Sequence, residues 1–261
     1  MISKPVKHEV LVLGEQISKF IFPKEFTDVI NRAYDNNKKS LPEWNEELVG
    51  KIQSEHNVNQ IMTDQLKKIF MACFQQYMAH LENAFTFKHI MRSQTLKLGD
   101  AWINEMCAGE YNPAHFHQGK KSLTGLSSVL ILKIPKTYGR EYSRHDMPSN
   151  GVLEFIGGQQ HPLAVSQKRI HPKVGDFYVF PYSLIHTVYP FRDTPDTRRT
   201  LSYNCDLVQM TKEDKDKRNK QNEKTLKDSV MHEPKWQKES TPVANPFAGK
   251  KGIQYGKNET I

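Results

Sequence analysis

The stretch Asn112-Pro-Ala-His-Phe-His-Gln-Gly-Lys-Lys-Ser-Leu-Thr-Gly125 decides the fold that we expect for this chain. It places two histidines, His115 and His117, one residue apart at the start of a strand-like apolar segment. On an extended chain, residues i and i+2 point to the same face, so both imidazoles can turn toward one point. A metal ion needs such convergent ligands and a third from elsewhere, and His186 is our candidate for it. The spacing therefore predicts a three-histidine metal site.

The segments around this stretch predict a mainly β domain. After residue 87, short apolar runs recur, and Gly, Pro, Asn and Asp separate them. Many short strands with turn signals between them are typical of a sandwich or barrel rather than of a parallel sheet. We expect strands at Gln94–Leu98, Ala101–Cys107, Ser122–Ile134, Val152–Ile156, Phe177–Phe180, His186–Tyr189 and Thr200–Val208.

Two amphipathic helices are predicted ahead of these strands, after a short strand candidate at residues 10–13. The first begins at Pro23, and the second runs from residue 58 or 63 to Leu81 with one apolar stripe. The helical period of the first is carried by Phe26, Val29, Ile30 and Ala33. We expect residues 1–93 to form a helical support region within the same domain as the barrel of residues 94–210.

The end of the chain differs from the rest in composition. From Lys212 to Ile261 there are twelve basic and eight acidic side chains, a net charge of +4 and half of the chain's +8. Such mixed charge with few large apolar residues predicts a charged, disordered tail over residues 211–261, with a solvated helix over its Lys/Glu part as the alternative. The remainder is only mildly basic, so charge gives little support to a nucleic-acid partner.

Two further absences narrow the class of protein. The N-terminus has no apolar leader, and no apolar run approaches the ~20 residues that span a bilayer, so we expect a cytoplasmic protein without a membrane partner. Cys73, Cys107 and Cys205 are far apart and form no Cys-x-x-Cys pair. We expect three reduced, buried thiols rather than a zinc site.

A second group of residues predicts a cation that binds a carboxylate near the metal. Arginine meets a carboxylate through its planar fork and stays charged when buried. We expect Arg198 to bind the carboxylate of an organic co-substrate, with a hydroxyl from Thr200 or Ser202, while Arg199 takes this role if the register is off by one. The polar residues Arg198, Thr200, Ser202 and Asn204 alternate with Arg199, Leu201, Tyr203 and Cys205.

The order of these motifs resembles that of the 2-oxoglutarate/Fe(II)-dependent oxygenases. The resemblance covers roughly residues 95–208 and is greatest for prolyl-4-hydroxylase-like members and for a group of bacterial and phage members. The matching pieces are Trp102-Ile-Asn104, His115-Phe-His117, Ser122-Leu-Thr-Gly125, Gly151-Val-Leu-Glu-Phe155, Pro172-Lys-Val-Gly-Asp176, Phe180-Pro181, His186 and Arg198-Arg-Thr200.

This resemblance implies a double-stranded β-helix, a jelly-roll or cupin-like barrel, braced here by the N-terminal helices. It implies Fe(II), 2-oxoglutarate as co-substrate and O2, and hydroxylation of a substrate that the sequence does not identify, with a peptide or amino acid slightly favoured. A phage-encoded member would act in the cytoplasm of the host cell. The implied metal ligands are His115, His117 and His186, and the implied co-substrate-binding residues are Arg198, Thr200, Ser202 and Asn104.

One residue departs from the family pattern. His117 stands where the family has an aspartate or glutamate, and three neutral histidines leave more positive charge on a metal than two histidines and a carboxylate. We favour His117 as a ligand, and the alternative is that Glu154 or Asp176 supplies a carboxylate instead. The departure also leaves open an inactive or altered enzyme.

Two other functions remain open at this point. One is a cupin-like metal protein, such as an isomerase or a three-histidine dioxygenase, that uses no 2-oxoglutarate and has no need of Arg198. The other is a non-enzymatic binding module built on the barrel. The polar segment Tyr138–Asn150, with Tyr142 as a pocket candidate, is either a substrate lid or a plain surface loop.

Overall fold

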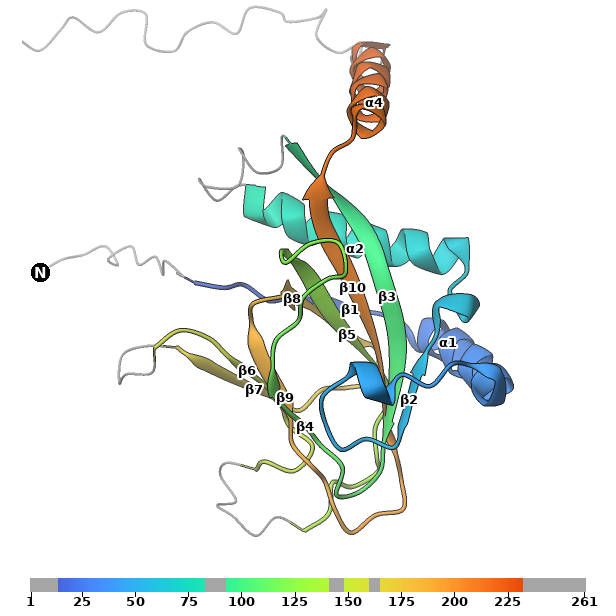
Figure 1. The fold of residues 1–261 in the computed structure, drawn as a ribbon, viewed down its shortest axis with the longest axis vertical. Helices are drawn as coiled ribbons and strands as arrows, with labels where there is room; N and C mark the ends of the chain where they lie inside the picture. Colours follow the sequence, from blue (N-terminus) through green and yellow to red (C-terminus); the bar gives the residue numbers. More distant parts are fainter. Residues whose placement is uncertain (1–13, 83–92, 141–147, 160–164, 232–261) are drawn as a thin grey trace, which may run out of the picture. The chain divides into compact units, whose positions relative to one another are not determined.

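Two antiparallel β-sheets form the centre of the computed structural model, which describes residues 14–82, 93–140, 148–159 and 165–231. The six-stranded sheet has the order β1-β8-β5-β10-β3-β2, and the four-stranded sheet has the order β4-β9-β6-β7 (Figure 1). This arrangement confirms the predicted fold class, a double-stranded β-helix with few helices. The strands of the six-stranded sheet are β1 (Ser18–Ile21), β2 (Ser54–Asn57), β3 (Gln94–Met106), β5 (Gly125–Lys133), β8 (Asp176–Pro181) and β10 (Arg198–Gln209). Those of the four-stranded sheet are β4 (Asn112–His115), β6 (Leu153–Ile156), β7 (Gln167–Ile170) and β9 (Ile185–Val188).

The long strand β10 lies between β3 and β5 and has two different faces. Its odd-numbered residues Leu201, Tyr203 and Cys205 are buried in the core on the helical side of the sheet. Its even-numbered residues Thr200 and Ser202 line a cavity on the other side. The alternation predicted from the sequence is therefore present in the structure.

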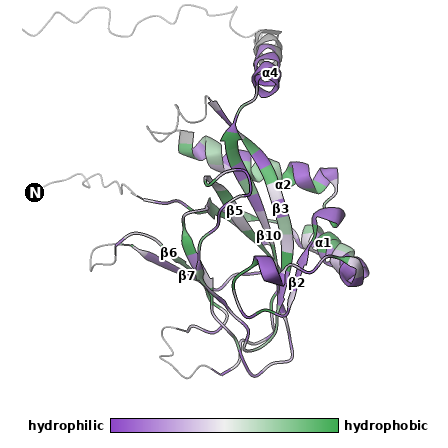
Figure 2. Cartoon of the chain, viewed as in Figure 1, coloured by the Kyte–Doolittle hydropathy of each residue, from purple (hydrophilic) through white to green (hydrophobic). Residues whose placement is uncertain are grey.

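Helices α1 (Lys24–Asn37) and α2 (Asp64–Glu82) pack against the six-stranded sheet (Figure 1). The predicted apolar stripe of α2 is buried in the core that it forms with the sheet. In Figure 2 both α2 and the strands of this sheet carry apolar residues, drawn in green. The predicted face of α1 is confirmed at Ile30, which is buried, and at Phe26, which packs against the core. It was wrong at Val29, which is 48% exposed, and it missed the buried Thr27 and Tyr34. Three short 3-10 helices complete the described N-terminal region: η1 (Lys38–Ser40), η2 (Asn45–Glu47) and η3 (Asn59–Ile61).

A second apolar core fills the space between the two sheets. It includes Val129 and Ile131 from β5, Phe180 from β8, and Leu153 and Phe155 from β6. The strand β5 is buried on both faces, and apart from Ser127 and Ser128 its residues after Gly125 form an apolar run up to Lys133. The residues near the triad thus stand on a rigid, packed support.

Some strands escaped prediction. The predicted segments Gln94–Leu98 and Ala101–Cys107 are one strand, β3, which continues through Gly99. The strands β1, β2, β4 and β7 have four residues each and were not expected. Cys107 is exposed, whereas Cys73 and Cys205 are buried as expected. The strand candidate at residues 10–13 and Tyr142 lie outside the described residues.

The chain divides into two compact units, residues 1–210 and residues 211–261. In the second unit, Lys212–Met231 form the helix α4. Over these residues the structure therefore matches the alternative prediction, a solvated helix, rather than the disordered tail. The first turns of α4 carry an i,i+4 ion pair between Lys217 and Glu213 at 2.7 Å, the kind of contact that supports a solvated helix. Its described side chains are mostly hydrophilic (Figure 2).

Within the described ranges, no helix combines the length and the apolar character that crossing a bilayer requires.

Phe70 of α2 tests how much the helices stabilise the barrel. It is fully buried, and its ring lies within 5.3–6.0 Å of those of Phe22, Phe26, Phe177 and Tyr203. We expect Phe70→Ala to lower the free energy of unfolding by about 3–5 kcal/mol, because it removes apolar burial and leaves a cavity. Urea unfolding followed by circular dichroism measures this. The exposed Gln76→Ala on the same helix is the control and should stay within about 0.5 kcal/mol of the wild type.

Candidate metal centre and active site

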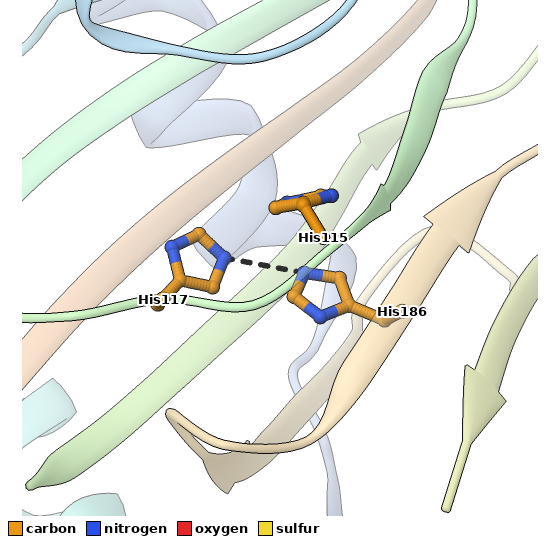
Figure 3. A group of neighbouring side chains, drawn as sticks. All are labelled: His115, His117 and His186. Atoms are coloured by element: carbon orange, nitrogen blue, oxygen red, sulfur yellow. Dashed lines mark hydrogen bonds between the residues drawn. The ribbon is translucent and has the colours of Figure 1, made fainter.

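Three histidines from two separate segments converge on one point (Figure 3). His115 ends β4, His117 follows in the next loop, and His186 lies in β9 directly opposite His115. Their ligand nitrogens all lie within 4.8 Å of one another, and the Nε2 atoms of His117 and His186 are 3.2 Å apart. Two nitrogens held at about 2.1 Å from one ion, at angles between about 90° and 109°, lie about 3.0–3.4 Å apart. The spacing fits two ligands of one metal.

Backbone carbonyls orient two of the imidazoles. Nδ1 of His115 is 2.7 Å from the carbonyl oxygen of Pro113, and Nδ1 of His186 is 3.0 Å from that of Leu184. Because a carbonyl oxygen only accepts, Nδ1 carries the hydrogen in both rings and donates it. The lone pair of each ring is then on Nε2, the atom that a metal would contact.

Burial keeps the three imidazoles neutral. It lowers the pKa of His186 to about 3, and the neighbouring His115 adds to this effect. Burial, with the two other imidazoles, also lowers the pKa of His117 well below its usual range. The pKa of His115 is lowered by burial as well, although its bond to a backbone carbonyl acts in the opposite direction. Neutral imidazole is the form that binds metal, so the donor set is ready at neutral pH.

The carboxylates considered as a substitute for His117 are held elsewhere. Glu154 forms an ion pair with Arg169 at 2.9 Å, and Asp176 forms one with Lys19 at 2.8 Å. Within the part of the chain that the structure describes, the one cluster of His, Cys, Asp and Glu with metal-ligand spacing is the histidine triad. The geometry therefore favours His117 over both carboxylates as the third donor.

Arg198 is a buried cation that forms no ion pair within the described residues. It is 1% exposed, and its Nη1 lies 3.6 Å from the sulfur of Met106. Its Nε and Nη2 atoms have no hydrogen-bond partner among the described residues. Burial lowers the pKa of Arg198 to about 10, and the guanidinium still stays charged at neutral pH. An isolated buried charge is costly, and this one lines the same cavity as the triad.

Arg199, in contrast, is neutralised on the opposite face of β10. Its Nη2 lies 2.7 Å from a carboxylate oxygen of Glu105 and 2.7 Å from one of Asp35. Lys38 reaches the other oxygen of Glu105 at 2.6 Å. Of the two neighbouring arginines, Arg198 is the one that faces the cavity, as the register predicted.

The cavity that contains the triad has a volume of about 120 Å³ and a wall with unmatched polar atoms. The predicted residues Asn104, Thr200 and Ser202 all line it. Oδ1 of Asn104 and Oγ of Ser127 are buried there without a hydrogen-bond partner among the described residues. Buried polar groups are normally paired, so the wall has the character of a binding site for a polar ligand.

Sequence reasoning missed part of this wall. Ser127 belongs to β5, where two serines, Ser127 and Ser128, stand in an otherwise apolar run, and that interruption is the signal that could have identified it. Asn112 also lines the cavity, and its Oδ1 is another buried atom without a partner among the described residues. The predicted lid at 138–150 lies largely outside the described residues.

A buried glutamate lies beside the cavity wall. Glu55 of β2 pairs directly with Asn104 of β3, and its Oε1 has no hydrogen-bond partner among the described residues. Burial, and then the nearby Glu110, raise the pKa of Glu55 to about 7. The folded protein therefore holds this proton up to near-neutral pH, whereas the unfolded chain releases it at lower pH.

The sequence comparison adds the family. Residues 100–204 match the family described as "Putative 2OG-Fe(II) oxygenase", and this range contains the triad and Arg198. The matched range covers about two fifths of the chain, so it shows a similarity of this segment to the 2OG-Fe(II) oxygenases. The resemblance predicted from the motifs is confirmed at this level. None of the curated proteins compared with the chain matches it.

Several solved structures are similar to this chain. A prolyl-4-hydroxylase from Pseudomonas putida has 13% sequence identity and a TM-score of 0.47, and the similarity covers 76% of this chain and 94% of that one. A viral collagen prolyl hydroxylase from Paramecium Bursaria Chlorella virus-1, in its 2OG complex, has 12% identity and a TM-score of 0.47, with 72% and 94% covered. A prolyl hydroxylase from Trichoplax adhaerens, in complex with a hypoxia inducible factor peptide fragment, has 12% identity and a TM-score of 0.46, with 74% and 83% covered. Similarity at this level carries no information on the substrate of this chain.

The buried proton of Glu55 predicts a dependence of stability on pH. A carboxyl whose folded pKa is raised favours the folded state at low pH, and this contribution is lost as pH rises from about 4.5 through 7. We expect Glu55→Gln to raise the free energy of unfolding near pH 8 by on the order of 2 kcal/mol and to change it little near pH 5. Urea unfolding at the two pH values measures this, with the exposed Glu46→Gln as control. An equal effect of Glu55→Gln at both pH values would contradict the assignment.

The two arginines predict opposite effects on stability in the absence of ligand. Arg198→Met should raise the free energy of unfolding by on the order of 1 kcal/mol, because it replaces an unpaired buried charge by an apolar side chain of similar length. Arg199→Met should lower it by about 3 kcal/mol, because Glu105 then loses its main partner. Thermal and urea unfolding of the ligand-free variants compare them directly. A loss of stability in Arg198→Met as large as that in Arg199→Met would show that Arg198 is a structural residue.

Proposed function

We propose that this protein is an Fe(II)- and 2-oxoglutarate-dependent dioxygenase that hydroxylates an organic substrate. In this proposal His115, His117 and His186 bind the iron, and Arg198 binds the far carboxylate of 2-oxoglutarate. The observation that carries the proposal is the unpaired guanidinium of Arg198 in the cavity that also contains the triad. The family match over residues 100–204 supports it independently.

The residues of the cavity fit both groups. The three neutral imidazoles form a donor set that suits iron and leaves other positions of the metal open, as a metal that binds substrates requires. The guanidinium of Arg198 offers Nε and Nη2 as two donors, which is the geometry that a carboxylate accepts. Thr200 and Ser202 add hydroxyls to the same wall, and Asn104 adds an amide.

When bound, Fe(II), 2-oxoglutarate and O2 supply the oxidising power for hydroxylation, in which the keto acid ends as succinate and CO2. The protein's own residues bind and orient. Pro113 and Leu184 hold the imidazoles through their carbonyls, and the apolar core between the sheets keeps water away from the reacting groups. Arg198 fixes the co-substrate at one end of the cavity.

Each alternative left open by the sequence fails to account for one part of the site. A cupin-like isomerase or a three-histidine dioxygenase without a keto-acid co-substrate has no use for a buried, unpaired arginine, which is costly to keep. A non-enzymatic binding module has no use for three imidazoles at ligand spacing. No observation specifically favours either.

The proposal is tested with purified protein under anaerobic conditions. We expect Fe(II) to bind, and addition of 2-oxoglutarate to produce a visible metal-to-ligand charge-transfer band. His117→Ala should abolish iron binding measured by metal analysis after desalting, and iron retained by this variant would move the third ligand elsewhere. Absence of the band in protein that holds iron would refute the use of 2-oxoglutarate.

The arginine pair supplies the matched control. Arg198→Met should weaken 2-oxoglutarate binding by at least about 2 kcal/mol, or roughly thirtyfold in Kd, while iron binding stays unchanged. Arg199→Met changes the same charge on the adjacent residue and should leave the affinity for 2-oxoglutarate within about threefold of the wild type.

A further inference from the structure

A second cavity adjoins that of the triad. It has a volume of about 500 Å³ and shares four lining residues with the first cavity: Glu47, Leu48, Trp102 and His117. Its wall includes Asn204 and Asp206, which lie on the same face of β10 as Arg198. This face of β10 therefore begins at a buried cation in the first cavity and ends at a buried carboxylate in the second, and His117 lines both cavities.

Asp206 is the counterpart of Arg198, a buried charged residue that forms no ion pair with any described residue. It is 3% exposed, and it accepts a hydrogen bond from the hydroxyl of Tyr182 at 3.1 Å. Of the two lysines in the same wall, Lys120 pairs with Asp100 at 3.0 Å and Lys121 is exposed.

The neighbouring wall offers a second acceptor. Oδ1 of Asn204 is buried and has no donor among the described residues. Removing a carboxylate from water without pairing it to a cation costs free energy, and so does burying an amide oxygen that has no hydrogen-bond donor. A bound ligand with hydrogen-bond donors would lower this cost. The floor of the cavity thus presents a carboxylate and an amide oxygen that can accept from a positively charged donor. Lys97 lies opposite Asp206 in the strand register but forms no ion pair with it.

The rest of the cavity suits an apolar stem that ends in a cation. Trp44, Trp102 and Tyr182 contribute aromatic rings to the wall. The ammonium of Lys120 already lies 5.0 Å from the ring centre of Trp44, so a ring of this wall has a face that a cation can approach. Leu98 adds aliphatic surface. Aromatic and aliphatic walls with a carboxylate at the floor are the chemistry that binds long basic side chains.

We propose that this second cavity binds the substrate through a protonated amine or guanidinium on a flexible apolar stem, as in a basic amino acid or a basic residue of a peptide. The cation would lie against Asp206 and Asn204, and the stem would extend past Trp102 toward His117. The proposal rests on the proposed function only in calling this ligand the substrate. The cavity and its unpaired carboxylate are independent of iron and 2-oxoglutarate.

Binding to the full-length protein without added metal tests the cavity. The probes are N-acetyl-lysine N-methylamide and its norleucine counterpart, which lacks only the ammonium, and the matched arginine and citrulline compounds. The fluorescence of the two tryptophans in the wall reports binding. We expect a charged probe to bind at least about tenfold more tightly than its neutral partner, and the lysine and arginine arms tell amine from guanidinium.

Variants connect the selectivity to one side chain. Asp206→Asn keeps an oxygen that can accept from Tyr182, and it should remove the preference for the charged probe without changing the affinity for the neutral one. Glu47→Gln makes the same change of charge at an exposed position of the same wall, where water screens it, and should alter affinity less than about twofold. Tyr182→Phe removes the hydroxyl and leaves the carboxylate, so the preference should persist.

Several results would overturn this inference. One is equal binding of charged and neutral probes in both arms. Another is an unchanged preference in Asp206→Asn that circular dichroism shows to be folded. If Asp206→Asn does not fold, Tyr182→Phe decides. Loss of the preference for the charged probe in a folded Tyr182→Phe would show that the carboxylate of Asp206 does not bind the cation by itself and only holds Tyr182. If the protein binds iron and 2-oxoglutarate but no charged probe, this inference is refuted and the proposed function stands. If it binds the charged probe selectively but gives no charge-transfer band with 2-oxoglutarate, the proposed function is refuted and this inference stands.

Discussion

The register of β10 between β3 and β5 is the constraint on which the rest of this structure depends. Leu201, Tyr203 and Cys205 must face the core under α2, because exposing them would cost the apolar burial that holds the helices to the sheet. Since the side-chain period of a strand is two, this choice also turns Arg198 and Ser202 to the other side. A slip by one residue would place Arg199 in the cavity and an apolar side chain against water. The core thus fixes the position of the site.

The same period explains how much could be predicted from the sequence. The long strands, the buried stripe of α2, the convergence of the three histidines and the choice of Arg198 over Arg199 all follow from periodicity and from alternation. The strands β1, β2, β4 and β7 were not predicted, whereas the equally short β6 and β9 were, because β6 and β9 lie within apolar runs of the sequence. Partners distant in the sequence form the other four strands, and their local pattern gave no strand signal. The face of α1 was missed at Val29 for a related reason, because Tyr34 and Thr27 carry polar atoms and do not count as apolar in a pattern.

Two buried carboxylates next to the cavities, Asp206 and Glu55, were the least predictable. Asp206 stands in an apolar strand and reads as an interruption of it, and Glu55 lies in a segment of polar composition. Their importance depends on their surroundings. Asp206 is buried without a cation paired to it among the described residues, and Glu55 lies near a second carboxylate, that of Glu110. Whether a charge is compensated depends on side chains from other strands, and local sequence does not contain that information.

Unpaired charges of opposite sign on one face of β10 also bear on the missing carboxylate of the triad. Three neutral imidazoles leave the full charge of a divalent ion in the cavity, and Arg198 adds another positive charge on the same side. An anionic co-substrate that binds the metal ion and Arg198 would compensate both positive charges. The departure at His117 therefore increases the electrostatic demand for such a ligand instead of removing it. Natural proteins keep uncompensated charges mainly where a ligand completes them, at a cost in stability. Under the proposed function, a histidine at position 117 in place of a carboxylate would make the chain more dependent on an anionic co-substrate, and Asp206 shows the same arrangement with the sign reversed.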